Sequence, residues 1–390
     1  MISTRERITF RELMKAAALS RTDNLIEYFR NLLPLESRHS LFTSSGRAAF
    51  EQIVLDAGLQ HSRIILPAFM PQDFVGIFRK YDMTPVFVDV DPHSYQLDLN
   101  GVTADLLDRC KAMLVLHTFG LPTDARPHRE LCERHGLVLI EDCARALGAS
   151  THGVRVGGFG HYALFSLPKC TPVRTGGIAL SERPMQPQLE AARIGFFGFL
   201  HALTLVRYPL LSFLERPAYA LLAGTAAYPG EVGIYEPLPA RELDWLAEAV
   251  LKGFMGQYPA ALEVKRQRAA ALCEALTPKG FSFQYDDGNH IRTSVSVEPP
   301  AGCDADDLQA FLKRRGIKAT AMWRNALGVS AFAERTWGTQ PSAAPVAGRL
   351  AKRLIQLPTS RVQTPRQTRA IVAACESYLA QTSSRRSVLD

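Results

Sequence analysis

The sequence predicts an α/β fold in which a mainly parallel sheet is buried between helices and is followed by a smaller C-terminal α+β domain. Between residues 40 and 182, short apolar runs rich in β-forming residues alternate with helical stretches. The runs are apolar on both faces, which is typical of parallel strands covered by helices on both sides. After residue 240, strand and helix patterns are mixed over a shorter stretch, which indicates a second unit.

The composition agrees with this fold class. The chain has 390 residues, of which 47% are apolar and 21% are charged. These values are ordinary for a soluble globular protein and exclude a disordered or collagen-like chain.

Six apolar runs are the predicted strands of the large sheet. They lie at residues 64–66, 86–88, 113–116, 137–140, 162–165 and 178–180, and the clearest helix between them covers 124–135. In sheets of this kind, ligands bind just beyond the carboxyl ends of the strands. The polar residues that end the runs are therefore the first candidates for function: Asp89, His117, Glu141, Asp142 and Ser166.

The C-terminal part contains four predicted elements. A helix is expected over 240–276, an alternating strand over 291–297, a helix over 304–315 that begins at the capping residue Asp304, and a last helix from Pro365 to about Leu379 with Thr364 as its cap. We therefore expect four regions along the chain: an N-terminal helical segment (1–39), a large domain (40–239), a small α+β domain (240–382) and a tail (383–390).

The segment 194–230 within the large domain is unusually apolar. It contains three charged residues, and its longest uncharged stretch is the 14 residues from Pro217 to Gly230. About 18 to 20 apolar residues are needed to cross a bilayer, so this segment is not expected to span one. We expect it to be covered by protein, partly at a dimer interface, and the alternative is a segment that lies on a membrane surface.

Charge and cysteine usage narrow the possible partners and location. The net charge of +7 is spread along the chain in short basic clusters that are not interleaved with aromatic residues, so nucleic-acid binding is not predicted. Anionic small substrates fit the same balance. The seven cysteines are scattered singly, and residues 1–15 lack the apolar run of a signal peptide. We therefore expect a cytoplasmic protein with reduced thiols, and no metal site is predicted.

Three segments of the large domain suggest chemistry, and the first is a turn of small residues. Residues 43–49 (Thr-Ser-Ser-Gly-Arg-Ala-Ala) open a predicted helix, where backbone N–H groups and the helix dipole favour a phosphate. Taken alone, the turn is explained better by ordinary helix capping, because small residues before a helix are more often a plain N-cap.

The second segment ends a buried strand with two carboxylates, Glu141 and Asp142. A buried carboxylate is costly unless a cation or a hydrogen-bond donor meets it, and a protonated pyridine nitrogen would serve. The alternative explanation is a carboxylate that caps the next helix.

The third segment, residues 165–177, places Lys169 in a loop between two apolar strands. Desolvation there would make its amine a nucleophile for an aldehyde, although an isolated lysine of this kind is usually an exposed loop residue. A phosphate turn, a strand-end acid and a lysine between strands, in this order, match what pyridoxal 5'-phosphate (PLP) needs.

With these segments the sequence resembles the DegT/StrS family of sugar aminotransferases, which are PLP enzymes of the aspartate aminotransferase fold (fold type I). The resemblance covers nearly the whole chain. It rests on Ser45-Gly46 ahead of a helix, residues 65–69, 85–92, 117–120 and 140–144, Phe165-Ser166 with Lys169, Gly176-Gly177, and later residues 265–268, 316–320 and 357–359.

The resemblance implies a set of roles for individual residues. Lys169 would form the Schiff base with the cofactor and then move the proton, and Asp142 would hold the pyridinium nitrogen. The cofactor phosphate would be bound by Ser45, Gly46 and Ser166, and Phe69 would stack on the ring. An adjacent subunit would complete each site, so a homodimer is expected.

The sequence also departs from the family pattern near the cofactor. Arg47 stands where Thr is usual, Arg145 where Gln is usual, and Arg174-Thr175 replaces the usual Gly-Glu before the glycine pair. Arg47 could still neutralise a phosphate, and Arg145 could change the electronics of the ring.

The resemblance implies an aminotransferase that converts a keto-sugar to an amino-sugar with L-glutamate as amino donor. We expect the keto-sugar to be nucleotide-linked. Two alternatives stay open. One is an aminotransferase for a lipid-linked or apolar ketone, suggested by the segment 194–230, and the other is a non-catalytic binding or regulatory relative, suggested by the departures.

Overall fold

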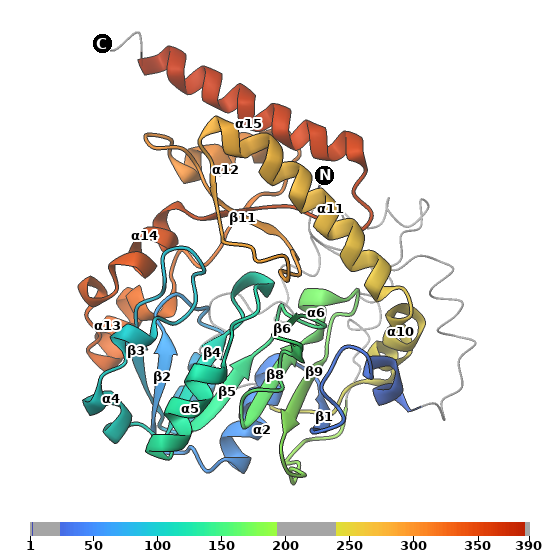
Figure 1. The fold of residues 1–390 in the computed structure, drawn as a ribbon, viewed down its shortest axis with the longest axis vertical. Helices are drawn as coiled ribbons and strands as arrows, with labels where there is room; N and C mark the ends of the chain where they lie inside the picture. The colour runs from blue at the N-terminus through green and yellow to red at the C-terminus, as the bar shows by residue number, and fades with distance from the viewer. Residues whose placement is uncertain (1, 3–23, 193–238, 387–390) are drawn as a thin grey trace.

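The computed structural model describes residue 2, residues 24–192 and residues 239–386, and all structural statements below concern these residues (Figure 1). A seven-stranded sheet with helices on its faces forms the lower part of the view, and a smaller four-stranded sheet with long helices lies above it. The segment 194–230 falls within residues 193–238 and lies outside the described residues.

The large sheet is mixed, with a parallel centre. Its strand order is β1-β9-β8-β5-β4-β2-β3. The five strands from β8 to β3 pair in parallel, whereas β9 is antiparallel to both β8 and β1. The strands are β1 (His39–Thr43), β2 (Arg63–Pro67), β3 (Thr84–Val88), β4 (Ala112–Leu116), β5 (Val138–Asp142), β8 (Tyr162–Ser166) and β9 (Gly177–Ser181).

All six predicted strands are confirmed, and β1 is an addition. Its sequence, HSLFT, begins with two polar residues and is only partly buried, because β1 lies at the edge of the sheet and pairs with β9 alone. The rule that finds buried parallel strands by their apolar character on both faces does not detect such an edge strand.

Helices cover both faces of the large sheet, as predicted. On β4, Leu114 packs into the core on one face with Phe50 and Ile53 of α2, whereas Met113 packs into the core on the other face with Cys132 of α5. The helices of this domain are α2 (Gly46–Asp56), α3 (Val75–Lys80), α4 (Ala104–Arg109), α5 (Arg126–His135) and α6 (Leu167–Cys170). Shorter elements are the 3-10 helices η1 (Leu25–Phe29), η2 (Leu99–Gly101) and η3 (Thr118–Gly120) and the hairpin β6 (Ser150–Thr151) and β7 (Val154–Arg155).

The C-terminal part is built on an antiparallel sheet of order β10-β11-β13-β12. Its strands are β10 (Ser282–Phe283), β11 (Val295–Glu298), β12 (Thr320–Ala321) and β13 (Ile355–Leu357). Its helices are α10 (Trp245–Met255), α11 (Tyr258–Leu276), α12 (Ala305–Arg314), α13 (Ala331–Trp337), α14 (Pro345–Arg353) and α15 (Pro365–Arg386), with 3-10 turns η4 (Thr277–Lys279), η5 (Leu327–Val329) and η6 (Pro341–Ala343). In Figure 1, α11 and α15 lie side by side across the top of this sheet.

Three predicted elements of this part are wrong in their bounds, and the last helix is described below. The single helix expected over 240–276 is two helices, because Gly256 ends α10 and Pro259 can begin a helix but has no N–H to continue one. The strand expected from 291 begins at 295, because Arg292 has a positive φ of 56° and the Ile291 N–H donates to the Gly120 carbonyl instead of to a neighbouring strand.

The two predicted helix caps, Asp304 and Thr364, are confirmed. The Asp304 carboxylate accepts from the N–H groups of Asp306 and Asp307, and the Thr364 hydroxyl accepts from the Gln367 N–H. The last helix extends to Arg386, well beyond the predicted end at Leu379. Within the described part of the chain, no helix combines the length and the apolar character needed to cross a bilayer.

Candidate active site

The predicted site residues gather at the carboxyl ends of β5 and β8, which are parallel neighbours in the sheet. Asp142 is the last residue of β5 and Ser166 the last of β8, and Lys169 follows on α6. The loop expected around the lysine is therefore a short helical turn. Pro168 favours the start of this turn, and both the N–H and the hydroxyl of Thr171 donate to the Leu167 carbonyl at 2.8 Å.

The predicted phosphate turn lies against Ser166. Ser45 caps α2, and its hydroxyl oxygen accepts from the Ala48 N–H at 3.1 Å. A Cβ atom added to Gly46 would lie 3.0 Å from the Ser166 Cβ, so these two segments are in close contact although they are far apart in the sequence. The start of α2 and the end of β8 together form a small-residue corner of the kind that a phosphate group needs.

The glycine pair allows β9 to begin next to this turn. The Gly176 N–H donates to the Ser44 carbonyl at 2.6 Å, and Gly176 has a φ of 124°, which disfavours any side chain. A Cβ atom on Gly177 would lie 2.3 Å from the Ser45 carbonyl oxygen. Both glycines are therefore required by the close approach of β9 to the phosphate turn.

Asp142 is a buried carboxylate with little compensation. Among the described residues, its side chain accepts one hydrogen bond, which the Ala144 N–H donates at 2.9 Å. Burial raises its pKa, and the charge of Lys169 and the Ala144 N–H offset this only in part. A cationic nitrogen placed at this carboxylate would remove the cost of burying it.

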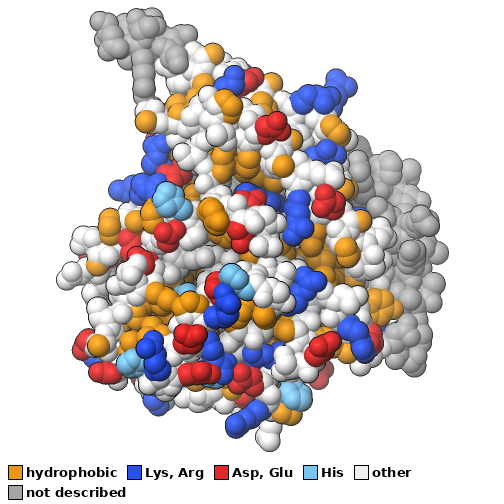
Figure 2. Space-filling view, in the orientation of Figure 1, with side chains coloured by type: hydrophobic (Ala, Val, Ile, Leu, Met, Phe, Trp, Pro, Cys, Tyr) orange, Lys and Arg blue, Asp and Glu red, His pale blue; other side chains and the backbone are white. Residues whose placement is uncertain are grey.

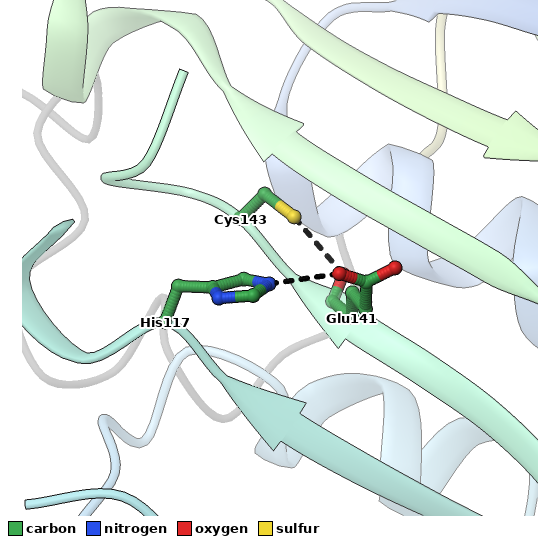
Figure 3. A group of neighbouring side chains, drawn as sticks. All are labelled: His117, Glu141 and Cys143. Carbon is green, nitrogen blue, oxygen red and sulfur yellow. Dashed lines mark hydrogen bonds and ion pairs between the residues drawn. The ribbon is translucent and has the colours of Figure 1, made fainter. Parts of the chain in front are cut away.

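Glu141, the neighbouring acid, is fully buried and fully satisfied (Figure 3). Its two oxygens accept from His117 Nε2 at 3.0 Å and from the backbone N–H groups of Gly157, Phe159 and Gly160 at 2.9, 2.8 and 2.6 Å. Burial alone would raise its pKa, but His117 and these N–H groups outweigh burial and lower it. Glu141 therefore holds the 157–160 loop on the sheet.

His117, Glu141 and Cys143 lie close enough to share a metal ion, and their hydrogen bonds explain the cluster without one. His117 Nδ1 accepts from the Thr123 N–H at 2.9 Å, so Nε2 carries the proton that is donated to Glu141. Burial raises the pKa of the Cys143 thiol well above its usual value, which disfavours the thiolate that a metal requires.

Asp73 was missed by the sequence analysis. It lies in the turn before α3, and its carboxylate is 3.4 Å from Lys169 Nζ. The sequence signal was available, because this turn follows the carboxyl end of β2, where ligands collect in such sheets. Asp89, which that rule did single out, accepts from the Val346 and Ala347 N–H groups at 2.9 Å and caps α14.

Phe69 and Arg145, a residue that departs from the family pattern, lie around the candidate site. The Phe69 ring is fully buried, with ring centroids 5.0 Å from Trp323 and 6.1 Å from Phe119, and its stacking on a cofactor stays a prediction. Arg145 is partly buried, and its Nη1 is 3.4 Å from the Gln356 amide oxygen across the domain boundary. Burial lowers its pKa, and the charges of Asp73 and Asp142 act against this shift.

Two further departures lie beside the phosphate turn. Arg47 is partly buried in the first turn of α2. The Thr175 hydroxyl donates to Asp244, the residue that caps α10, so this departure ties the glycine pair to the C-terminal part.

Comparison with protein-family models matches residues 4–177 to the DegT/DnrJ/EryC1/StrS aminotransferase family. The match covers less than half of the chain, and it shows that this part is similar to that family. The matched part contains the phosphate turn, the strand-end acids, Lys169 and the glycine pair, and thus every segment of the candidate site in the large domain.

The curated relatives of this chain carry two kinds of name. GDP-perosamine synthase of Vibrio cholerae is 32% identical over 133 residues, which are 34% of this chain and 36% of the relative. A protein of Geobacillus stearothermophilus named pleiotropic regulatory protein is 25% identical over 83% of this chain and 80% of its own length. The alignments with three of the curated relatives, the Vibrio cholerae protein among them, cover 36%, 22% and 35% of the relatives' own lengths. The chain therefore spans about a third or less of each of these three relatives.

The family fold is shown by solved structures. DesI, crystallised in the presence of its TDP-sugar product, superposes with a TM-score of 0.73 over 100% of this chain and 95% of its own, at 22% identity. The chain therefore has the same fold as DesI, which is fold type I, as expected.

Proposed function

We propose that this chain is a PLP-dependent aminotransferase that converts a nucleotide-linked keto-sugar to an amino-sugar, with L-glutamate as amino donor. The observation that carries the proposal is the arrangement of Lys169 and Asp142. A lysine on a helical turn lies near an under-compensated buried carboxylate, at the sheet edge where ligands bind. The match of residues 4–177, which include Lys169 and Asp142, to the aminotransferase family model supports the same conclusion.

The residues present fit PLP at three points. The uncompensated carboxylate of Asp142 matches the protonated ring nitrogen, and the corner made by Ser45, Gly46 and Ser166 matches the phosphate. Lys169 is the amine between them. When bound, PLP would supply an aldehyde for amino groups and an electron-withdrawing ring.

Each residue would do a separate part of the work. The Lys169 amine would hold the cofactor through its aldehyde carbon and later carry the proton between substrate and cofactor carbons. Asp142 would keep the ring nitrogen protonated. Ser166 and the first turn of α2 would fix the phosphate, so that the ring cannot turn away from the lysine.

The names of relatives support the substrate class. GDP-perosamine synthase is named for a nucleotide-linked amino-sugar, and DesI was crystallised with a TDP-sugar. A basic chain with a net charge of +7 suits such an anionic substrate. We propose a homodimer in the cytoplasm, and the seven unpaired cysteines support a reducing compartment.

Absorbance of the purified protein tests the activity. We expect a yellow protein that loses its colour on adding glutamate and regains it on adding the correct keto-sugar. The panel should contain GDP-, UDP- and dTDP-linked keto-sugars, a lipid-linked ketone and, as a second donor, glutamine. A protein that binds PLP but stays yellow with every donor would contradict the proposal.

The alternative of a regulatory relative has one specific observation in its favour. Among the curated relatives described above, the longest alignment is with a protein named pleiotropic regulatory protein. The same absorbance experiment separates the two functions, because turnover of the colour by glutamate is expected of the enzyme and not of a non-catalytic relative.

A further inference from the structure

We propose that Asp73 is a positioning residue for Lys169. Its carboxylate forms an ion pair that holds the Lys169 side chain in place whenever the lysine is not bonded to the cofactor. The proposal rests on the proposed role of Lys169.

The contact between the two side chains is direct. Lys169 Nζ lies 3.4 Å from Asp73 Oδ2, and the two side chains are 31% and 41% exposed. Both side chains are therefore accessible to a ligand, and both are shielded enough from solvent for their charges to interact. The other charged groups around the pair are Asp142 at the end of β5 and Arg145 after it.

The backbone that carries Asp73 is fixed by the C-terminal part of the chain. Residues 325–328 form three hydrogen bonds with residues 68–72: Leu327 N–H to the Met70 carbonyl at 2.9 Å, Gly328 N–H to the Ala68 carbonyl at 3.0 Å, and the Gln72 side-chain amide to the Asn325 carbonyl at 2.8 Å. Gly328 is in such close contact that an added Cβ would lie 2.5 Å from the Ala68 Cα. The segment that ends at Asp73 is therefore held against the loop 325–328.

The backbone that carries Lys169 is fixed from the other side. The Leu167 N–H donates to the Gly176 carbonyl at 3.0 Å, and the Cys170 thiol lies 3.7 Å from the Ala144 carbonyl. The two charged side chains thus extend from two anchored segments, and their meeting is a property of the fold.

The chemistry of the pair follows from its charges. The carboxylate attracts the Lys169 amino group and so limits the positions that this side chain can take. Asp73 therefore holds the free lysine where an aldehyde carbon can meet it. Loss of the Asp73 charge would leave the amine less defined in position and would slow its reaction with an aldehyde.

The test measures cofactor capture by the apoprotein, without any substrate. PLP is added at a series of pH values, and the rate at which the cofactor absorbance changes is recorded for the wild type, Asp73→Asn and Asp73→Glu. Borohydride reduction with peptide mapping verifies that the captured cofactor is on Lys169. We expect Asp73→Asn to capture PLP about tenfold more slowly at every pH of the series, because its amine is less well positioned, and Asp73→Glu to recover most of the wild-type rate.

Asp82→Asn is the matched control. Asp82 lies just beyond α3, whereas Asp73 lies just before it, and Asp82 is 85% exposed and pairs with His61. The pH profile of PLP capture by Asp82→Asn should equal that of the wild type. A profile of Asp73→Asn that coincides with both would overturn the role of Asp73. Failure of the wild type to be labelled at Lys169 would instead contradict the proposed function.

Discussion

At the scale of single residues, two adjacent carboxylates at the end of β5 have different roles. Successive side chains on a strand point to opposite faces, so Glu141 and Asp142 enter different surroundings. Glu141 accepts four hydrogen bonds and has a lowered pKa, whereas Asp142 has a raised pKa. The first therefore stabilises the fold, and the second is the one that we propose to meet a cationic ligand.

Glu141→Gln should destabilise the protein. The amide cannot accept from all four donors, and we expect the free energy of unfolding at pH 7 to fall by about 3 kcal/mol. A lowered carboxyl pKa contributes stability above its usual value of 4.5 that is lost as the pH falls through the folded-state pKa. Urea unfolding should therefore show that the variant and the wild type differ less in their free energy of unfolding near pH 4 than at pH 7. An equal difference in this free energy at both pH values would contradict this role of Glu141.

Asp142→Asn should behave in the opposite way. Its raised pKa means that ionisation costs folding free energy, increasingly so as the pH rises above the usual value of 3.8, so the apoprotein variant should be at least as stable as the wild type at pH 7. The rate of the glutamate half-reaction should fall by orders of magnitude, because the carboxylate matters most in the transition state. A nearly wild-type rate for this variant, with a folded but inactive Glu141→Gln, would show that the two acids were assigned in the wrong order.

The sequence could identify this pair of acids but could not separate their roles by residue type alone. The choice of Asp142 came from the family resemblance, and the structural reason lies in the 157–160 loop, whose N–H groups fold back onto Glu141. Asp73 was missed for a similar reason. Its partner, Lys169, is 96 residues away, and local patterns carry no information on such contacts.

At the scale of elements, the site depends on how closely β9 approaches the start of α2. Gly177 allows this approach, since an added Cβ would meet the Ser45 carbonyl at 2.3 Å. The obstacle is a backbone atom, so no side-chain rotation can relieve it. The same contact brings together the turn and the strand that would bind a phosphate.

Gly177→Ala should therefore cost about 2 kcal/mol or more of stability and weaken PLP binding. Gly348→Ala is the control, because Gly348 lies inside α14 with open space around it and alanine favours a helix. Urea unfolding and a PLP titration of both variants test this. An unchanged stability and PLP affinity for Gly177→Ala would contradict the account of the glycine pair.

The elements that were predicted and those that were missed differ in a physical way. Strands buried on both faces show a continuous apolar run, and all six were found. The edge strand β1, the break at Gly256 and the positive φ of Arg292 depend on edge position, backbone conformation and contacts with other elements. Such features are weakly encoded in local sequence patterns.

At the scale of the whole molecule, the two parts of the chain meet around the site. Arg145 reaches Gln356 of the small sheet, the Ile291 N–H donates to Gly120, and Asp89 caps α14. On the face seen in Figure 2, basic and acidic side chains are interspersed and do not form one continuous basic surface. This pattern suits a small anionic substrate bound in the interior better than a nucleic acid.

The apolar segment 194–230 leads to a prediction about assembly. Burying each of its large apolar side chains is worth about 1.5 to 3 kcal/mol, so the protein should cover them. We expect a stable dimer in analytical ultracentrifugation that does not bind vesicles in a flotation assay. Protein that floats with lipid, or stays dispersed only in detergent, would contradict this and favour a membrane-associated substrate.

Borohydride reduction of the PLP-loaded protein, followed by peptide mapping, tests the central claim most directly. Lys169 should carry the label, because it is the lysine that follows β8 at the carboxyl edge of the sheet and lies near Asp142. Lys169→Ala should lose the label while the rest of the map stays unchanged. A label on another lysine, such as Lys111 or Lys265, or no label on the wild-type protein, would contradict the assignment of the active site.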